Sequence, residues 1–215
     1  MIAPDGVNLE KFDVEFSQEE ARKTLGLPPH VKLIGYVGAF RTIGMEKGID
    51  IAIHSMKILP EKDSILVLVG GHTGDIEFYK KLVKALDIVD RVIFVGRVSF
   101  SLVPLYLRAF DVLLAPFPEN EHYSYYMSPM KIFEYMAAKK PIISTNLPSL
   151  RDIIGNGEAI LVAPGSAKEL SSAINKVLTD TDLSGNLANK AYNRALSFTW
   201  YDRAKNISDS IKKNK

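Results

Sequence analysis

The carboxylate of Glu134 is the group in this sequence whose position most needs a chemical explanation. Glu134 lies in the predicted helix of residues 129–138, for which Ser128 is a typical N-cap and Pro129 a typical first residue. A helical wheel divides this segment into Ile132, Phe133, Met136 and Ala137 on one side and Lys131, Glu134, Tyr135 and Ala138 on the other. The first side must face the core, so Glu134 is predicted to point away from it. Glu134 is also too far into the helix to cap free backbone N–H groups.

Two uses remain for this carboxylate. A carboxylate accepts two hydroxyl hydrogen bonds at once, which suits the diol of a ribose bound near the carboxyl end of a strand. It also suits an ion pair with Lys131, three residues earlier, which would be worth about 0.2–0.5 kcal/mol. Spacing alone leaves both interpretations open.

Short apolar runs alternate with amphipathic segments from Lys32 onward, a pattern typical of parallel βαβ units. The predicted strands are residues 33–38, 65–70, 92–96, 112–115, 141–144 and 159–162. The predicted helices are residues 48–59, 76–86, 102–109, 129–138, 150–154, 167–178, 183–196 and 201–212. Strands that are apolar throughout are expected where helices cover both faces of a sheet. We therefore predict an α/β fold, a doubly wound Rossmann-like parallel sheet of about six strands with extra C-terminal helices.

Three of the predicted strands end in glycine, at Gly38, Gly70 and Gly96. A glycine at such a place lets the chain turn sharply or lets a ligand approach the backbone. In open parallel sheets, ligands bind outside the carboxyl ends of the strands. Gly38, which ends the first strand, is therefore a candidate binding residue, although each of the three is also explained as an ordinary turn glycine.

The composition excludes several classes of protein. With 215 residues, 47% of them hydrophobic and 24% charged, the chain suits one large globular domain. A net charge of +2 gives no basis for a nucleic-acid partner. There is no Cys, and the four His show no ligand spacing, so no metal site is expected. No apolar run approaches the roughly 20 residues that span a bilayer, which predicts a cytoplasmic domain.

Five stretches of the sequence match the motifs of one enzyme family in order and spacing. They are residues 2–12, Tyr36–Gly38 with Glu46–Gly48, Asp111–Pro116, Lys131–Ala138 and Phe198–Trp200. The chain thereby resembles glycosyltransferase family 4, in the C-terminal, donor-binding domain of its GT-B fold. The resemblance implies that the donor substrate is a nucleoside diphosphate sugar, UDP- or GDP-linked, and that the reaction needs no cofactor and no metal.

The resemblance also implies roles for single residues. Glu134 would bind the ribose hydroxyls, and Lys47 would contact the donor diphosphate, where the start of the next helix adds to the attraction for anions. Members of the family commonly carry an Arg after the glycine of the first strand, where this sequence has Ala39. Arg41, two residues later, is the candidate replacement as a bidentate phosphate clamp. Lys47 and Arg41 are thus the candidate catalytic residues.

A second departure concerns two glutamates that the family separates by seven residues. The first of them usually contacts the sugar, and its position is occupied here by Tyr126. The backbone N–H groups of Tyr126, Met127 and Ser128 lie just ahead of the predicted helix and are candidates to bind phosphate or sugar oxygens. By resemblance, the backbone at Arg97 and Val98 is expected next to the nucleobase.

The predicted organisation has an interdomain linker and entry segment at residues 1–30, a nucleotide-sugar-binding domain at 31–197 and a C-terminal helix at 198–215, where Trp200 is expected to anchor the core. The predicted function is donor binding in a retaining enzyme that transfers a hexose to a glycan or lipid-linked acceptor, in the cytoplasm or at the cytoplasmic face of the membrane. An N-terminal domain absent from this sequence would hold the acceptor, so the domain alone is expected to be inactive or weakly active. A sugar-nucleotide epimerase and a non-catalytic nucleotide-sensing module are the alternatives.

Overall fold

Six parallel strands form the central sheet of the computed structural model, which describes residues 3–42 and 44–213. Residues 1–2, 43 and 214–215, which include Ile2 of the first matched stretch and the ends of the predicted segments 1–30 and 198–215, lie outside the described residues. The strands are β1 (Lys32–Val37), β4 (Ser64–Val69), β5 (Val92–Gly96), β6 (Val112–Ala115), β7 (Ile142–Thr145) and β8 (Ile160–Val162). Their order is β5-β4-β1-β6-β7-β8, so the chain winds outward from β1 in both directions. This is the strand order of a Rossmann sheet, whose crevice lies where the order reverses, and it confirms the predicted fold class.

Helices pack on both faces of this sheet and bury it in two hydrophobic cores. The helices are α1 (Gln18–Leu25), α2 (Ile49–Ile58), α3 (Thr73–Ala85), α4 (Val103–Ala109), α5 (Met130–Ala137), α6 (Pro148–Ile154), α7 (Ala167–Thr179), α8 (Thr181–Ala195) and α9 (Trp200–Lys213). One core contains side chains of α2, α3 and α7, and the other contains side chains of α1, α4, α5 and α8. Coverage of both faces explains why the strands are apolar throughout. Among the described residues, no helix is long and apolar enough to cross a membrane.

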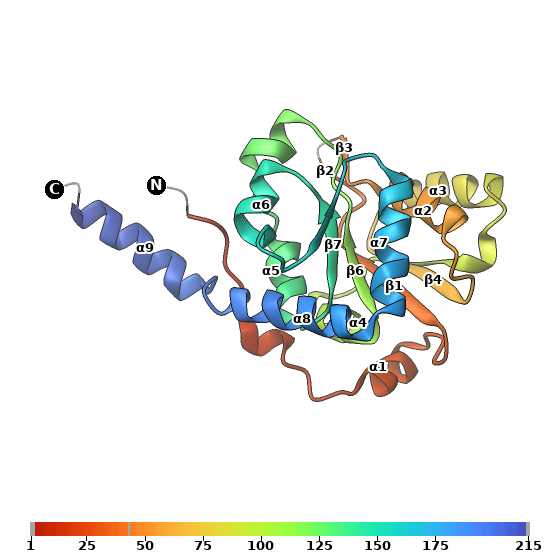
Figure 1. Ribbon diagram of the computed structural model, residues 1–215, viewed down its shortest axis with the longest axis horizontal. Coiled ribbons are helices and arrows are strands. Elements are labelled where there is room, and N and C mark those ends of the chain that lie inside the picture. The colour runs from red at the N-terminus through yellow and green to blue at the C-terminus, as the bar shows by residue number, and fades with distance from the viewer. Residues whose placement is uncertain (1–2, 43, 214–215) are drawn as a thin grey trace.

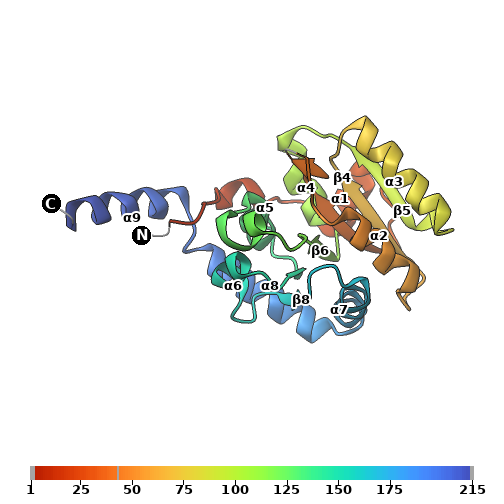
Figure 2. The ribbon, with the colours of Figure 1, turned by 90° about the horizontal axis from the view of Figure 1, so that it is seen from above.

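The two ends of the described chain lie side by side, and α9 extends away from the sheet in both Figure 1 and Figure 2. Val7 pairs with Thr199 in a parallel bridge, and Arg203 of α9 forms an ion pair with Asp5. Trp200 is 45% exposed, because α9 leaves the body of the domain at this residue. The expectation that Trp200 anchors the core is therefore wrong.

Several short elements have no counterpart among the predicted ones. Among them are helix α1 and the antiparallel hairpin of β2 (Arg41–Thr42) and β3 (Met45–Glu46). Helix α1 begins with a capping box formed by Ser17 and Glu20. It is held on the domain by Arg22, whose guanidinium lies 2.7 Å from the carboxylate of Asp111 at the start of β6. The predicted entry segment of residues 1–30 thus includes a helix that packs against α4 on one face of the domain.

Candidate functional site

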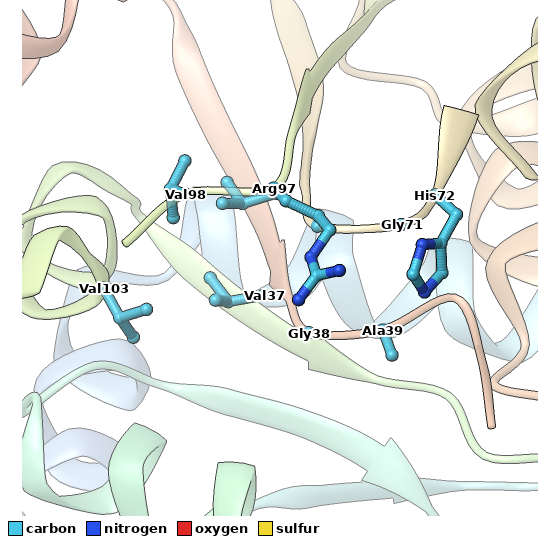
Figure 3. Close-up of a pocket in the computed structure, with 10 residues that line it drawn as sticks. Val37, Gly38, Ala39, Gly71, His72, Arg97, Val98 and Val103 are labelled. Atoms are coloured by element: carbon cyan, nitrogen blue, oxygen red, sulfur yellow. The ribbon is translucent and has the colours of Figure 1, made fainter. Parts of the chain in front are cut away.

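A cavity of about 230 Å³ opens at the carboxyl ends of β1, β4 and β5. Its walls are formed by residues 37–39 and 69–72 together with Arg97, Val98 and Val103. Figure 3 shows the guanidinium of Arg97 extending into the cavity toward Gly38, with His72 near Ala39. Three of the residues that the sequence singled out, Gly38, Arg97 and Val98, therefore meet at one edge of the sheet.

Two glycines bring the loops of this edge into contact. Gly38 follows β1 with a φ of +138°, and Gly70 follows β4 with a φ of +117°. A Cβ atom on Gly70 would lie 2.1 Å from the carbonyl oxygen of Gly38, so no side chain fits there. The two loops consequently pack backbone against backbone beside the cavity.

Lys47 lies at the same edge, next to Gly48, the N-cap residue of α2. The next residue, Gly48, has a φ of +78°, and a Cβ atom there would lie 1.7 Å from the carbonyl oxygen of Pro116. The Lys47 ammonium is 4.6 Å from the centroid of the Tyr123 ring. Burial lowers the pKa of Lys47, and the ion pairs of the described residues do not include this lysine. The charge of Lys47 is therefore partly desolvated, and no acid within the described ranges forms an ion pair with it.

Arg41, the other candidate cation, lies in the β2–β3 hairpin and is bound to two carboxylates. Its guanidinium is 2.6 Å from Glu46 and 3.7 Å from Asp75, and it stacks over the ring of Phe78 at 4.9 Å. These contacts neutralise its charge and fix its direction. Arg41 thus differs from Lys47, because a phosphate would have to compete with two acids for it.

Glu134 lines a second cavity, of about 220 Å³, together with Gly6, Asn8, Met130 and Trp200. Burial raises the pKa of Glu134, and the nearby charge of Lys131 opposes this shift. The ion pairs of the described residues include no pair between these two side chains, so the surface ion pair considered above is not formed. The carboxylate faces a cavity that adjoins the entry segment.

The loop before α5 differs from its predicted shape. Tyr126 ends a short π-helical turn, His122–Tyr126, and its side chain is 71% exposed. Helix α5 begins at Met130 with Pro129 as its N-cap, so Ser128 does not cap the helix as expected. The hydroxyl of Ser128 instead accepts a hydrogen bond of 2.9 Å from the backbone N–H of Asp5. This contact ties the loop that contains Tyr126, Met127 and Ser128 to the entry segment.

The helical wheel was also wrong for Tyr135, which is fully buried. Its hydroxyl accepts a hydrogen bond of 2.8 Å from the backbone N–H of Val37 and donates one of 3.2 Å to the Val37 carbonyl oxygen. A buried main chain at the end of a strand needs such partners, so the tyrosine hydroxyl completes the pairing of β1. Tyr135 thereby attaches α5 to the edge that carries the first cavity.

Lys131 is the residue that sequence reasoning missed. Its ammonium is buried, lies 3.7 Å from the centroid of the Tyr36 ring and has no hydrogen-bond partner among the described residues. The helical wheel placed Lys131 on the side away from the core, where it would be exposed to solvent or paired with Glu134. The structure instead points the side chain toward β1.

The family of the chain is identified by comparison with known proteins. The sequence model described as "Glycosyl transferases group 1" matches residues 17–194. D-inositol 3-phosphate glycosyltransferase of Corynebacterium diphtheriae is 26% identical, over 96% of this chain and 48% of that protein. The lipopolysaccharide core biosynthesis mannosyltransferase LpsB of Rhizobium meliloti is 27% identical, over 81% of this chain and 49% of that protein. The chain thus spans about half the length of these relatives.

Solved structures of related proteins share the fold. Sucrose-phosphate synthase from Thermosynechococcus elongatus matches with a TM-score of 0.82 and 26% identity, over 99% of this chain and 52% of that one. HepE of Anabaena, solved in complex with UDP, matches with a TM-score of 0.79 and 21% identity, over 97% of this chain and 56% of that one. The chain therefore belongs to the group 1 glycosyl transferases, and it has the fold of their C-terminal, nucleotide-sugar-binding domain within the GT-B architecture.

Proposed function

We propose that this chain binds a nucleoside diphosphate sugar at the carboxyl edge of its sheet and presents the sugar for transfer to a glycan or lipid-linked acceptor. The observation that carries the proposal is Lys47, a partly desolvated ammonium with no ion-pair partner among the described residues, at the edge where the cavity opens. A cation in such surroundings is stabilised by an anion that arrives with a ligand. The UDP bound in HepE is an anion of this kind.

In this proposal Lys47 binds the donor diphosphate and Glu134 binds the ribose hydroxyls. The other contacts come from the main chain of Gly38, Arg97, Val98, Tyr126, Met127 and Ser128. The backbone at Arg97 and Val98 lies next to the nucleobase. Arg41 has a smaller part, because its guanidinium must leave Glu46 and Asp75 before it can bind phosphate.

Transfer breaks the bond between the anomeric carbon of the sugar and the terminal phosphate oxygen, and the bonding electrons remain on the departing diphosphate. A fixed ammonium stabilises this charge as it develops. A hydroxyl oxygen of the acceptor forms the new bond to the anomeric carbon, and the proton of that hydroxyl passes to the diphosphate. We propose a hexose donor, retention of the anomeric configuration and no role for a metal ion. The acceptor is held by an N-terminal domain of the full-length protein, and the cytoplasmic location stays a prediction from the sequence.

Titration calorimetry of the purified chain with UDP- and GDP-linked hexoses, in buffer that contains a chelator, tests this proposal. We expect one of the two donors to bind, with the same affinity after magnesium is added, since no three His, Asp or Glu side chains gather within residues 3–42 and 44–213. Binding that requires magnesium would contradict the metal-free site. Conversion of the bound donor to its epimer without an acceptor would identify an epimerase instead. Equal, weak binding of many nucleotides without preference for a sugar would identify a sensing module.

A further inference from the structure

The ammonium of Lys131 occupies a place that is costly for a cation. Its Nζ atom is buried without a hydrogen-bond partner among the described residues, although other atoms of the residue keep some exposure. The Nζ atom lies 3.7 Å from the centroid of the Tyr36 ring, and this cation–π contact offsets part of the cost of burying the charge. Burial is the largest cause that lowers the pKa of Lys131. A buried cation that lacks an acid is expected where a ligand supplies the opposite charge.

A second cation lies close by. The ammonium groups of Lys131 and Lys47 are 5.5 Å and 5.6 Å from the centroid of the same ring, that of Phe117. The charge of Lys47 lowers the pKa of Lys131 further, whereas Glu134 only partly offsets this effect. Two lysines that repel each other, with no ion pair to an acid among the described residues, have the composition expected of an anion site.

The position of Lys131 also connects this pair to the first cavity. A Cβ atom on Gly38 would lie 2.9 Å from the Lys131 ammonium, so the amine is in contact with the loop that forms the cavity wall. Tyr135, one turn along α5, holds the end of β1 from the same helix. The helix therefore fixes the amine at the edge of the sheet where β1 ends.

We propose that Lys131 binds the diphosphate of the donor together with Lys47, as the second cation of a two-lysine phosphate site. The proposal rests on the proposed function, since it takes the anion to be a nucleoside diphosphate. It also supplies the second charge that Arg41, bound to Glu46 and Asp75, does not offer. Residues 3–42 and 44–213 offer the Lys131 ammonium no ion-pair partner, and in this proposal the bound donor supplies one.

The test compares Lys131→Met with a matched control, Lys140→Met. Methionine keeps an unbranched side chain that lacks the terminal amine, and so it removes the charge. Lys140 is also a buried lysine, but it lies beside Asp111 in a different cavity, away from the carboxyl ends of the strands where the donor is proposed to bind. For each protein we would measure the affinity for UDP or GDP, whichever the unaltered chain binds more tightly, by calorimetry. Binding of the matching nucleoside would be measured by ligand-observed NMR, and unfolding by a thermal melt.

We expect Lys131→Met to weaken binding of the nucleoside diphosphate about 10- to 100-fold, while binding of the nucleoside changes less than about twofold. Its melting temperature should not fall, because the substitution removes a buried amine that has no hydrogen-bond partner in the described part of the chain. Lys140→Met should bind both ligands as the unaltered chain does. Unchanged binding of the diphosphate by Lys131→Met, or equal losses for diphosphate and nucleoside, would overturn the assignment of Lys131. An unaltered chain that binds neither ligand would instead contradict the proposed function.

Discussion

The hydroxyl of Tyr135 is bound to both main-chain groups of Val37, at 2.8 Å from its nitrogen and 3.2 Å from its oxygen. One side chain of α5 thereby pairs the last residue of β1, and it does so in the interior of the domain. Helix α5 also carries Lys131, proposed to bind phosphate, and Glu134, proposed to bind ribose. The contact between Tyr135 and Val37 therefore fixes how far these two side chains lie from the loop after β1. The geometry of the proposed site depends on it.

Tyr135→Phe should lower the free energy of unfolding by about 1–3 kcal/mol, because it leaves the N–H and C=O groups of Val37 buried without a partner. Urea denaturation measures the change. Tyr126→Phe is the matched control, since Tyr126 is 71% exposed and should tolerate the loss of its hydroxyl. If Tyr135→Phe is as stable as the control, the hydroxyl has no structural part.

Lys47→Ala should weaken binding of the nucleoside diphosphate by about 1.5–3 kcal/mol, the usual contribution of a hydrogen bond to a charged group. The free energy of unfolding should barely change, because Lys47 forms no ion pair with a described residue. Arg41→Ala should cost less affinity, since Glu46 and Asp75 already neutralise its charge. Calorimetry on both variants decides the order, and a larger loss for Arg41→Ala would show that the phosphate site has been placed wrongly.

Much of the fold was predictable from the sequence, because a sheet covered on both faces needs apolar strands and the runs of apolar residues mark them. The hairpin that contains Arg41 and Glu46 could not be predicted, because each of its strands has only two residues and such short strands leave no periodic pattern. This hairpin supplies Glu46, one of the two acids that neutralise the charge of Arg41.

The candidate site was predictable only in part, for a different reason. Glycines at strand ends indicate an edge where ligands bind, and Gly38 indeed lines the cavity there. The environments of Lys131 and Tyr135 depend on Tyr36 and Val37, and Val37 lies 98 residues from Tyr135 in the chain. A helical wheel assigns every position that faces away from the core to solvent. It cannot show that another part of the chain covers such a position.

The stability of the domain should depend on pH through Lys140. Burial lowers the pKa of Lys140 from 10.5 to about 8, and the charge of Arg108 adds to the shift. Between these values the unfolded chain keeps a proton that the folded chain has lost, so the free energy of unfolding should rise with pH by at most about 1.4 kcal/mol per unit. The stability gained at high pH is lost as the pH falls through the lowered pKa of Lys140.

The measurement is a set of urea titrations at pH values between about 8 and 9.5, on the unaltered chain and on Lys140→Met. The difference between the two proteins isolates Lys140 from other groups that titrate in this range. We expect that difference to change steadily with pH. A difference that is the same at every pH would mean that Lys140 keeps its ordinary pKa.

The chain should fold by itself but transfer little sugar. Its two cores are formed within the described residues, so a cooperative melt is expected. Holding donor and acceptor together contributes about 7–11 kcal/mol to lowering such a barrier, and we expect a chain that spans about half the length of its relatives to orient only the donor. A melt followed by a transfer assay with candidate acceptors checks both parts, with slow hydrolysis of the donor as background. Efficient transfer would mean that this chain is a complete enzyme.

The central claim is that a donor nucleotide binds with its ribose on Glu134, and Glu134→Gln tests it most directly. Calorimetry would compare the loss of affinity for the nucleoside diphosphate with the loss for inorganic pyrophosphate, which has no ribose. Glu77→Gln, an exposed acid on α3, is the control. We predict a loss of about tenfold or more for the nucleotide and almost none for pyrophosphate, because the amide replaces a charged acceptor of two hydroxyl groups. Equal losses for the two ligands would contradict the account.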